Sequence, residues 1–269
     1  MNLHLQTVPA RQGLAWIRHG FAVYKRRPLA MSSLCSFVFM LMLVLPQLLP
    51  PLGVILALLP PLLSLGFMLA THEVLQGRAP KLGVFLAPLR LTVQRRRSQM
   101  WMCLLFAVLQ FGIGLLASSL FGDSVERLVN ARTAPTPNDA AVLAAVSDPR
   151  LLQGFLVWSI LQTLVAIPFW QAPALVHWSG QGAPQALFSS TLALWRNRAA
   201  FTVYGLGWAA AFLAISLVLL PVAALLGPQL GVAFLALAMI SLATTFNSSL
   251  YFSFVDCFLS GSPDKLELK

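Results

Sequence analysis

Residues 80–114 read PKLGVFLAPLRLTVQRRRSQMWMCLLFAVLQFGIG, and the rest of the chain repeats their pattern. The stretch opens on a proline and continues through a short amphipathic segment to Arg95, Arg96 and Arg97. An apolar run then begins at Met100. An amphipathic segment, a cluster of basic residues and an apolar run, in that order, are typical of a chain that lies on a membrane surface and then enters the bilayer.

The same order of features occurs twice more, over residues 9–28 and 184–198. We call the cluster of basic residues in each copy a basic corner. The three basic corners contain Lys25, Arg26, Arg27, Arg95, Arg96, Arg97, Arg196 and Arg198. We interpret residues 1–269 as a single integral membrane domain of three related units, about 9–79, 80–183 and 184–262. Each unit is predicted to contain an amphipathic interfacial helix followed by a helical hairpin.

The composition excludes a soluble globular protein. Of 269 residues, 58% are hydrophobic and 10% are charged, whereas about 25% of the residues of a soluble domain are charged. Six apolar runs approach or exceed the roughly 20 residues that cross a bilayer as a helix: 29–49, 52–75, 100–121, 151–176, 199–220 and 230–250. Barrel strands would alternate polar and apolar residues instead. The predicted fold class is therefore all-α, a polytopic membrane protein with six transmembrane helices and three amphipathic interfacial helices.

The basic residues are distributed unevenly between the two sets of connections. Fifteen of the eighteen Lys and Arg residues lie in residues 1–28, 76–99, 177–198 and the tail after residue 256. The positive-inside rule predicts a multi-pass protein of the bacterial inner membrane with both termini in the cytoplasm. We expect the partner of these basic residues to be the anionic headgroup region of the bilayer. No nucleic-acid partner is expected, although the net charge is +10.

Three local features add detail to this arrangement. Apolar residues at three- and four-residue steps predict an interfacial helix over 9–27, with Trp16 and Tyr24 at headgroup depth. Pro60 and Pro61 predict a kink in the second span. Residues 122–150 are predicted to form an extracytoplasmic loop with two short helices.

One set of ionisable residues recurs in register with the prolines. Glu73, His177 and Asp256 lie seven residues before Pro80, Pro184 and Pro263, and His72 precedes the first of them. A polar stripe leads toward Asp256 along one face of the sixth span, because its members are four residues apart: Ser241, Thr245, Ser249 and Ser253.

Two interpretations of these residues remain open. If the three units surround one axis, Glu73, His177 and Asp256 could meet in a proton relay or a site for a hard cation. Alternatively, the carboxylates cap helix ends near the interface and pair with the basic corners, while the hydroxyls pack helices together. The sequence contains no recognisable catalytic, phosphate-binding or metal-binding motif. We therefore expect no enzyme, cofactor or metal.

The chain resembles an uncharacterised proteobacterial family, the BPSS-type integral membrane proteins. The likeness lies in the six spans, in the first basic corner with Pro28 after it, and in the leader Val8-Pro9-Ala10-Arg11-Gln12-Gly13 with Trp16. The resemblance covers the whole chain. It implies a bacterial inner-membrane protein and carries over no activity, cofactor or functional residue.

Two functional classes follow from the sequence. The first is a non-enzymatic membrane protein that organises lipid, or a membrane protein partner, with anionic headgroups bound at the basic corners. The alternative is a small transporter or channel that uses the ionisable cluster and the polar stripe near the cytoplasmic face.

Overall fold

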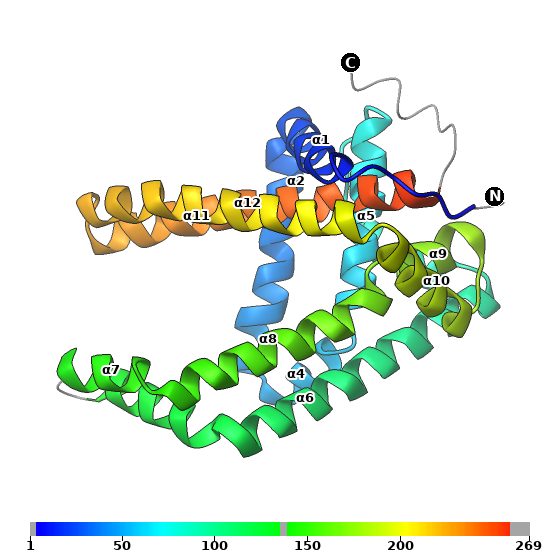
Figure 1. The fold of residues 1–269 in the computed structure, drawn as a ribbon. Helices are drawn as coiled ribbons and strands as arrows, with labels where there is room; N and C mark the ends of the chain where they lie inside the picture. The colour runs from blue at the N-terminus through cyan, green and yellow to red at the C-terminus, as the bar shows by residue number, and fades with distance from the viewer. Residues whose placement is uncertain (1–3, 135–138, 259–269) are drawn as a thin grey trace.

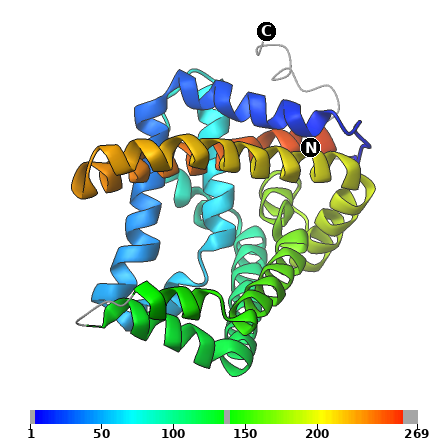
Figure 2. The ribbon, with the colours of Figure 1, turned by 60° about the vertical axis from the view of Figure 1, so that its left-hand side comes forward.

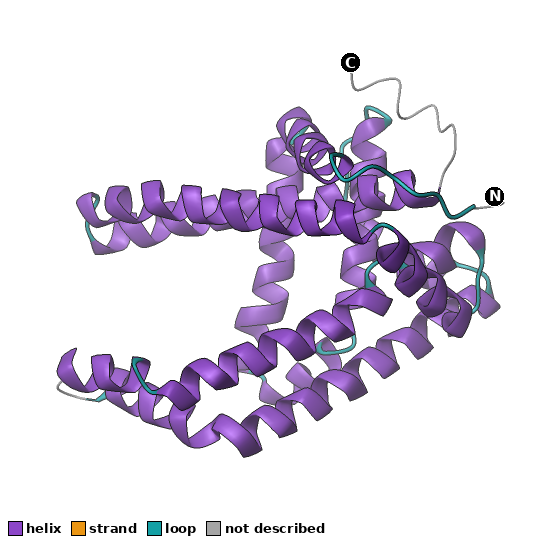
Figure 3. Ribbon diagram, viewed as in Figure 1, coloured by secondary structure: helices purple, strands orange, loops and turns teal. Residues whose placement is uncertain are grey.

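The computed structural model describes residues 4–134 and 139–258, and within these the fold is helical without strands (Figure 3). The first hairpin contains α2 (Pro28–Phe39), the π-helix η1 (Met40–Val44), α3 (Leu45–Leu48), α4 (Pro50–Leu56) and α5 (Pro60–Leu75). The second contains α6 (Val93–Thr133), α7 (Asp139–Val146), α8 (Pro149–Phe169) and α9 (Ala172–Ser179). The third contains α11 (Arg198–Leu225) and α12 (Pro228–Phe258). Before these hairpins lie α1 (Gln12–Arg26), the 3-10 helices η2 (Leu82–Phe85) and η3 (Ala87–Arg90), and α10 (Ala183–Arg196).

The predicted spans have counterparts among the described helices. Five helical segments are long and apolar enough to cross a membrane, and α4 with α5 makes a sixth if the bent pair is counted as one span. The break between α4 and α5 bends the chain by 63°. Pro60 and Pro61 begin the new helix, where their missing N–H groups cost no hydrogen bond. The kink predicted at these prolines is thus confirmed as a break in the helix.

The second interfacial segment consists of two short 3-10 helices, η2 and η3, within residues 82–90. Pro88 interrupts an α-helix here, because it lacks an amide hydrogen and disfavours an α-helical residue before it. At the start of the predicted extracytoplasmic loop, residues 122–133 belong to α6, an unbroken helix of 41 residues that ends at Thr133. A helix of this length extends about 60 Å, twice the hydrocarbon thickness of a bilayer. The boundary at residue 262 lies outside the described residues.

The three hairpins diverge from a shared hub. In Figures 1 and 2, α11 and α12 run together at a steep angle to α2 and α5, while α6 and α8 leave in a third direction. The hydrophobic core lies in the hub, where it includes Trp16, Met31, Leu65, Leu175 and Phe254. The far parts of the hairpins carry exposed apolar side chains, such as Leu217 and Leu237, each 67% exposed. The packed core therefore holds the hairpins at one end, and the remaining lengths have the apolar surface of membrane-embedded helices.

The segments before the hairpins connect the three hairpins in a cycle. Helix α1, before the first hairpin, packs on α11 and α12 of the third. The turn η2, before the second hairpin, packs on α5 of the first, where Phe85 lies against Gly66. Helix α10, before the third hairpin, packs on α8 and α9 of the second. Each segment thus contacts a hairpin other than the one that it precedes, which closes the hub.

Candidate functional site

The second basic corner lies at the start of α6 and faces two environments. Arg95 is half-buried, and its Nη1 atom donates a hydrogen bond to the carbonyl oxygen of His177 in α9 at 3.0 Å. One helical turn later, the buried Gln99 donates from Nε2 to the carbonyl oxygen of Pro173 at 2.8 Å. Because residues i and i+4 share a helix face, this face holds α6 against α9.

The neighbouring face of α6 is turned outward. Arg96 and Arg97 are exposed. Trp101 follows Arg97 by four residues and is 56% exposed. The next positions on this side, Leu104 and Val108, are 46% and 58% exposed. A guanidinium group thus adjoins an aromatic ring and an apolar stripe, an arrangement that suits the boundary between lipid headgroups and acyl chains.

Trp101 was not among the residues singled out from the sequence. The signal was present in the four-residue spacing between Arg97 and Trp101, since that spacing brings side chains together on a helix. The sequence did not indicate that Arg95 would turn toward another helix while its two neighbours stayed outside. That division depends on where α9 packs.

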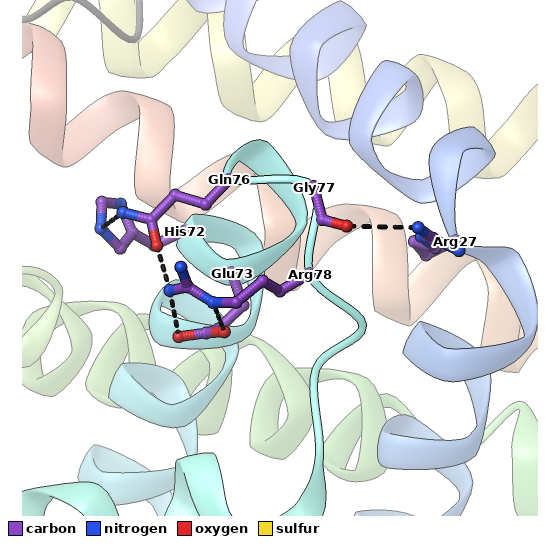
Figure 4. A network of polar contacts seen from close by, with 6 residues as sticks. All are labelled: Arg27, His72, Glu73, Gln76, Gly77 and Arg78. Atoms are coloured by element: carbon purple, nitrogen blue, oxygen red, sulfur yellow. Dashed lines mark hydrogen bonds and ion pairs between the residues drawn. The ribbon is translucent and has the colours of Figure 1, made fainter.

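The other two basic corners also contact the ends of helices. Arg27 donates from Nη2 to the carbonyl oxygen of Gly77, directly after α5, at 3.2 Å (Figure 4). In the third corner the buried Asn197 lies between Arg196 and Arg198, and its Nδ2 atom is 3.5 Å from Sγ of Cys257 near the end of α12. A side chain of the first two corners, and Asn197 beside the third, thus reaches the closing end of the hairpin that follows. The remaining residues of these two corners, Lys25, Arg26, Arg196 and Arg198, are exposed.

Glu73 and His72 belong to a surface network at the end of α5. Glu73 accepts two hydrogen bonds from Arg78, with Nε to Oε2 at 2.5 Å and Nη2 to Oε1 at 2.8 Å (Figure 4). His72 contacts the hydroxyl of Tyr251 through Nδ1 at 2.9 Å, and Nε2 of Gln76 through its own Nε2 at 2.8 Å. The adjacent carboxylate raises the pKa of Arg78. Glu73 thus has a basic partner near the helix end.

Asp256 has a different set of partners. It is 6% exposed, and its Oδ2 atom accepts hydrogen bonds from Nε2 of Gln12 at 2.5 Å and from Nε1 of Trp16 at 2.8 Å. Trp16 itself is fully buried. Its indole, which the sequence suggested for headgroup depth, packs against Phe201 and Tyr204 of α11 and donates to Asp256 of α12.

His177 lies near the end of α9. Its ring is half-buried beside Trp178, and its Nδ1 atom is buried without a hydrogen-bond partner among the described residues. The described part of the chain also contains no group of three or more His, Cys, Asp or Glu side chains placed to hold a metal ion.

The polar stripe of α12 faces the other helices of the hub. Ser241 accepts a hydrogen bond from the Tyr24 hydroxyl at 2.9 Å, and the hydroxyls of Ser249 and Tyr204 lie 2.6 Å apart. Thr245 and Ser253 are buried and donate to carbonyl oxygens of α12 itself, those of Ser241 and Leu250. Such contacts allow helices to approach closely.

Gly20 of α1 shows how close this approach is. A Cβ atom at Gly20 would lie 2.7 Å from the carbonyl oxygen of Thr245 and 2.8 Å from Cβ of Ser249. The polar stripe and the glycine therefore form one packed interface between α1 and α12.

The comparisons with known proteins agree with this membrane architecture. The chain is 31% identical over 264 residues to "Probable inner membrane protein BTH_II0599" of Burkholderia thailandensis, and the match covers 94% of this chain and 91% of the relative. No protein-family model and no solved structure matches the chain. The resemblance drawn from the leader, the corners and the spans is thereby confirmed. The chain belongs to the same family of inner membrane proteins as this Burkholderia protein.

Proposed function

We propose that the protein is a non-enzymatic inner membrane protein that gathers anionic lipid at its basic corners. The observation that carries this proposal is the outward face of α6, where Arg96 and Arg97 are exposed directly before an exposed apolar stripe. Lysine and arginine near an anionic surface each contribute about 1 kcal/mol of attraction. Because Arg95 and Gln99 fix the other face of α6, the two exposed guanidinium groups are held in place rather than on a mobile tail.

The proposed orientation places all three corners on the cytoplasmic side, with both termini there as well. The support is the charge distribution, since fifteen of eighteen Lys and Arg residues belong to that side. The proposed architecture is three related units closed in a cycle. Its support is the packing of α1, η2 and α10, each on the hairpin of another unit.

The transporter alternative has less support. It requires the polar stripe and Asp256 to line a path for water or ions. Asp256 is instead buried with Gln12 and Trp16, and the stripe packs against α1 and Tyr204. We therefore retain the lipid-organising function.

The proposal is tested on the lipids that accompany the protein out of the membrane. The full chain is extracted with its surrounding lipid in polymer nanodiscs, and the lipids are quantified by mass spectrometry. We expect phosphatidylglycerol or cardiolipin to be enriched over the bulk membrane, and the enrichment to fall when Arg96 and Arg97 are changed to glutamine. The Arg132→Gln variant, changed near the far end of α6, is the control and should keep the enrichment. Equal lipid composition in wild-type and bulk membrane would refute the proposal.

A further inference from the structure

Two apolar grooves lie on either side of Trp101. Their volumes are about 680 and 720 Å³, within the range of about 300–1,000 Å³ that is common for ligand pockets. Both grooves are lined by Arg97, Trp101 and Leu104. The exposed indole ring is thus a ridge between two hollows that share one arginine.

The walls come from three parts of the fold. The first groove lies between the start of α6 and two residues near the α4–α5 break, Leu58 in the break and Leu62 in the first turn of α5. The second lies between α6, through Leu105 and Val108, and the beginning of α10 at Leu187. Each groove is therefore built where α6 meets another unit or segment, and its walls are largely aliphatic.

The polar groups gather at one end of the grooves. Arg96 and Arg97 line the first, and Gln94, Arg97 and Ser98 line the second, all within the first turns of α6. No acidic side chain is among the described residues that line either groove. The grooves thus combine positive charge and hydrogen-bond donors at the corner with apolar walls along the rest of their length.

We propose that these grooves form a site for one anionic diacyl phospholipid, with an acyl chain on each side of Trp101 and the phosphate at Arg97. This inference rests on the proposed lipid-organising function and names its ligand. A single-chain amphiphile would fill one groove and leave the other empty. An arginine guanidinium is suited to the phosphate because it offers several N–H donors in one plane.

A related groove occurs at the third basic corner. It has a volume of about 500 Å³ and lies between α8, α10 and α11, with Trp170, Trp195 and Arg198 among its lining residues. The guanidinium carbon of Arg198 is 5.6 Å from the ring centroid of Trp195. Like the first groove at Trp101, it separates the preceding hairpin from the first helix of the next. The pairing of tryptophan and arginine beside an apolar groove thus recurs at an equivalent place in the cycle.

The test uses the purified, delipidated full chain in a mild detergent and native mass spectrometry. The probes are dioleoylphosphatidylglycerol, dioleoylphosphatidylcholine and the single-chain lysophosphatidylglycerol. We expect dioleoylphosphatidylglycerol to bind about tenfold more tightly than dioleoylphosphatidylcholine or lysophosphatidylglycerol, a difference in binding free energy of about 1.4 kcal/mol. Trp101→Ala and Arg97→Gln should each remove most of this preference.

Matched controls come from the same hairpin. Trp158 is 44% exposed in α8 and lines an apolar groove that contains Glu126 but no arginine. Trp158→Ala should therefore leave the phosphatidylglycerol affinity unchanged, as should Arg132→Gln. Thermal unfolding of each variant identifies any loss of affinity that follows from misfolding. Trp101→Phe keeps an aromatic ring between the two grooves and should retain binding.

Three results would overturn the proposal. These are unchanged phosphatidylglycerol binding by Trp101→Ala, equal affinity for the single-chain lipid, or equal affinity for phosphatidylcholine. If Trp101→Ala binds normally while the combined loss of Arg96 and Arg97 still lowers anionic-lipid enrichment in nanodiscs, the two-chain site fails and the broader function stands. If wild-type protein prefers no anionic lipid in either experiment, both fail.

Discussion

Removing the two exposed arginines of the second corner should abolish local enrichment of anionic lipid around the start of α6. The perturbation is Arg96→Gln with Arg97→Gln, and it leaves Arg95 in place because that side chain holds α9. At about 1 kcal/mol for each basic residue near an anionic surface, the loss is about 2 kcal/mol. This corresponds to about a 30-fold lower preference at the corner.

The assay measures lipid enrichment at this position alone. A fluorophore is attached to a cysteine that replaces the exposed Thr92, directly before α6 and outside the lining of both grooves. The three native cysteines, Cys35, Cys103 and Cys257, are buried. In nanodiscs, quenching by nitroxide-labelled phosphatidylglycerol is compared with quenching by nitroxide-labelled phosphatidylcholine. The wild-type ratio should exceed that of the double variant. Raising the salt from about 0.1 to 1 M, which shortens the Debye length from about 10 to 3 Å, should lower the wild-type ratio only.

Arg132→Gln is the control for this experiment. It removes one exposed charge near the other end of α6. The reasoning is refuted if the double variant keeps the wild-type quenching ratio, or if Arg132→Gln lowers the ratio as much as Arg97→Gln alone.

Three further predictions concern the hub. Gly20→Val should destabilise the protein by about 1–3 kcal/mol through overpacking against Thr245 and Ser249. Gly112→Val is the control, because no atom lies within 4 Å of the added Cβ, and it should leave chemical denaturation unchanged. Equal effects of the two substitutions would contradict the tight α1–α12 interface. Cysteines replacing Asp256 or Ser249 should resist a membrane-impermeant thiol reagent, whereas rapid labelling would favour the transporter alternative. Burial lowers the pKa of His19, against a smaller opposing effect of Asp256. Below about pH 6.5 the unfolded chain therefore binds a proton at this residue more readily than the folded protein does, which favours unfolding. The thermal midpoint should fall as the pH decreases below this value, and it should fall less in His19→Asn.

Much of the helical architecture could be predicted because bilayer thickness imposes a length on apolar runs. The third run, 100–121, is a segment of α6, and the sixth, 230–250, is a segment of α12. The break at Pro60 was also predictable, since proline lacks the amide hydrogen that a continuous helix requires. Helix ends were less predictable. No local signal stops α6 at residue 121, and the helix continues to Thr133.

The environment of the amphipathic segments could not be predicted from their periodicity. An apolar face has the same spacing whether it meets lipid or protein. Trp16 shows the difference, because it was expected at headgroup depth and is fully buried against Asp256. In residues 82–90, by contrast, the interruption at Pro88 is evident in the sequence, and the chain forms two 3-10 helices there.

The positive charge of the candidate site could be predicted from the sequence, but not which arginines are exposed and which one packs against another helix. The corner at Arg95, Arg96 and Arg97 is evident in the sequence. Which arginine turns inward depends on tertiary packing, because His177 is distant in the chain and reaches Arg95 only through the docking of α9 on α6. The grooves beside Trp101 likewise need three separate segments to come together.

Lipid binding at the basic corners requires all three corners to face the anionic cytoplasmic leaflet, and the membrane topology is therefore the measurement to make. Reporters whose activity depends on the compartment are fused after Ala134 and after Ser262 in the full-length chain. We predict that the reporter after Ala134 is active outside the cytoplasm and that the reporter after Ser262 is active inside it. The reverse pattern, or both reporters on one side, would contradict the proposed orientation and the lipid-binding role of the corners.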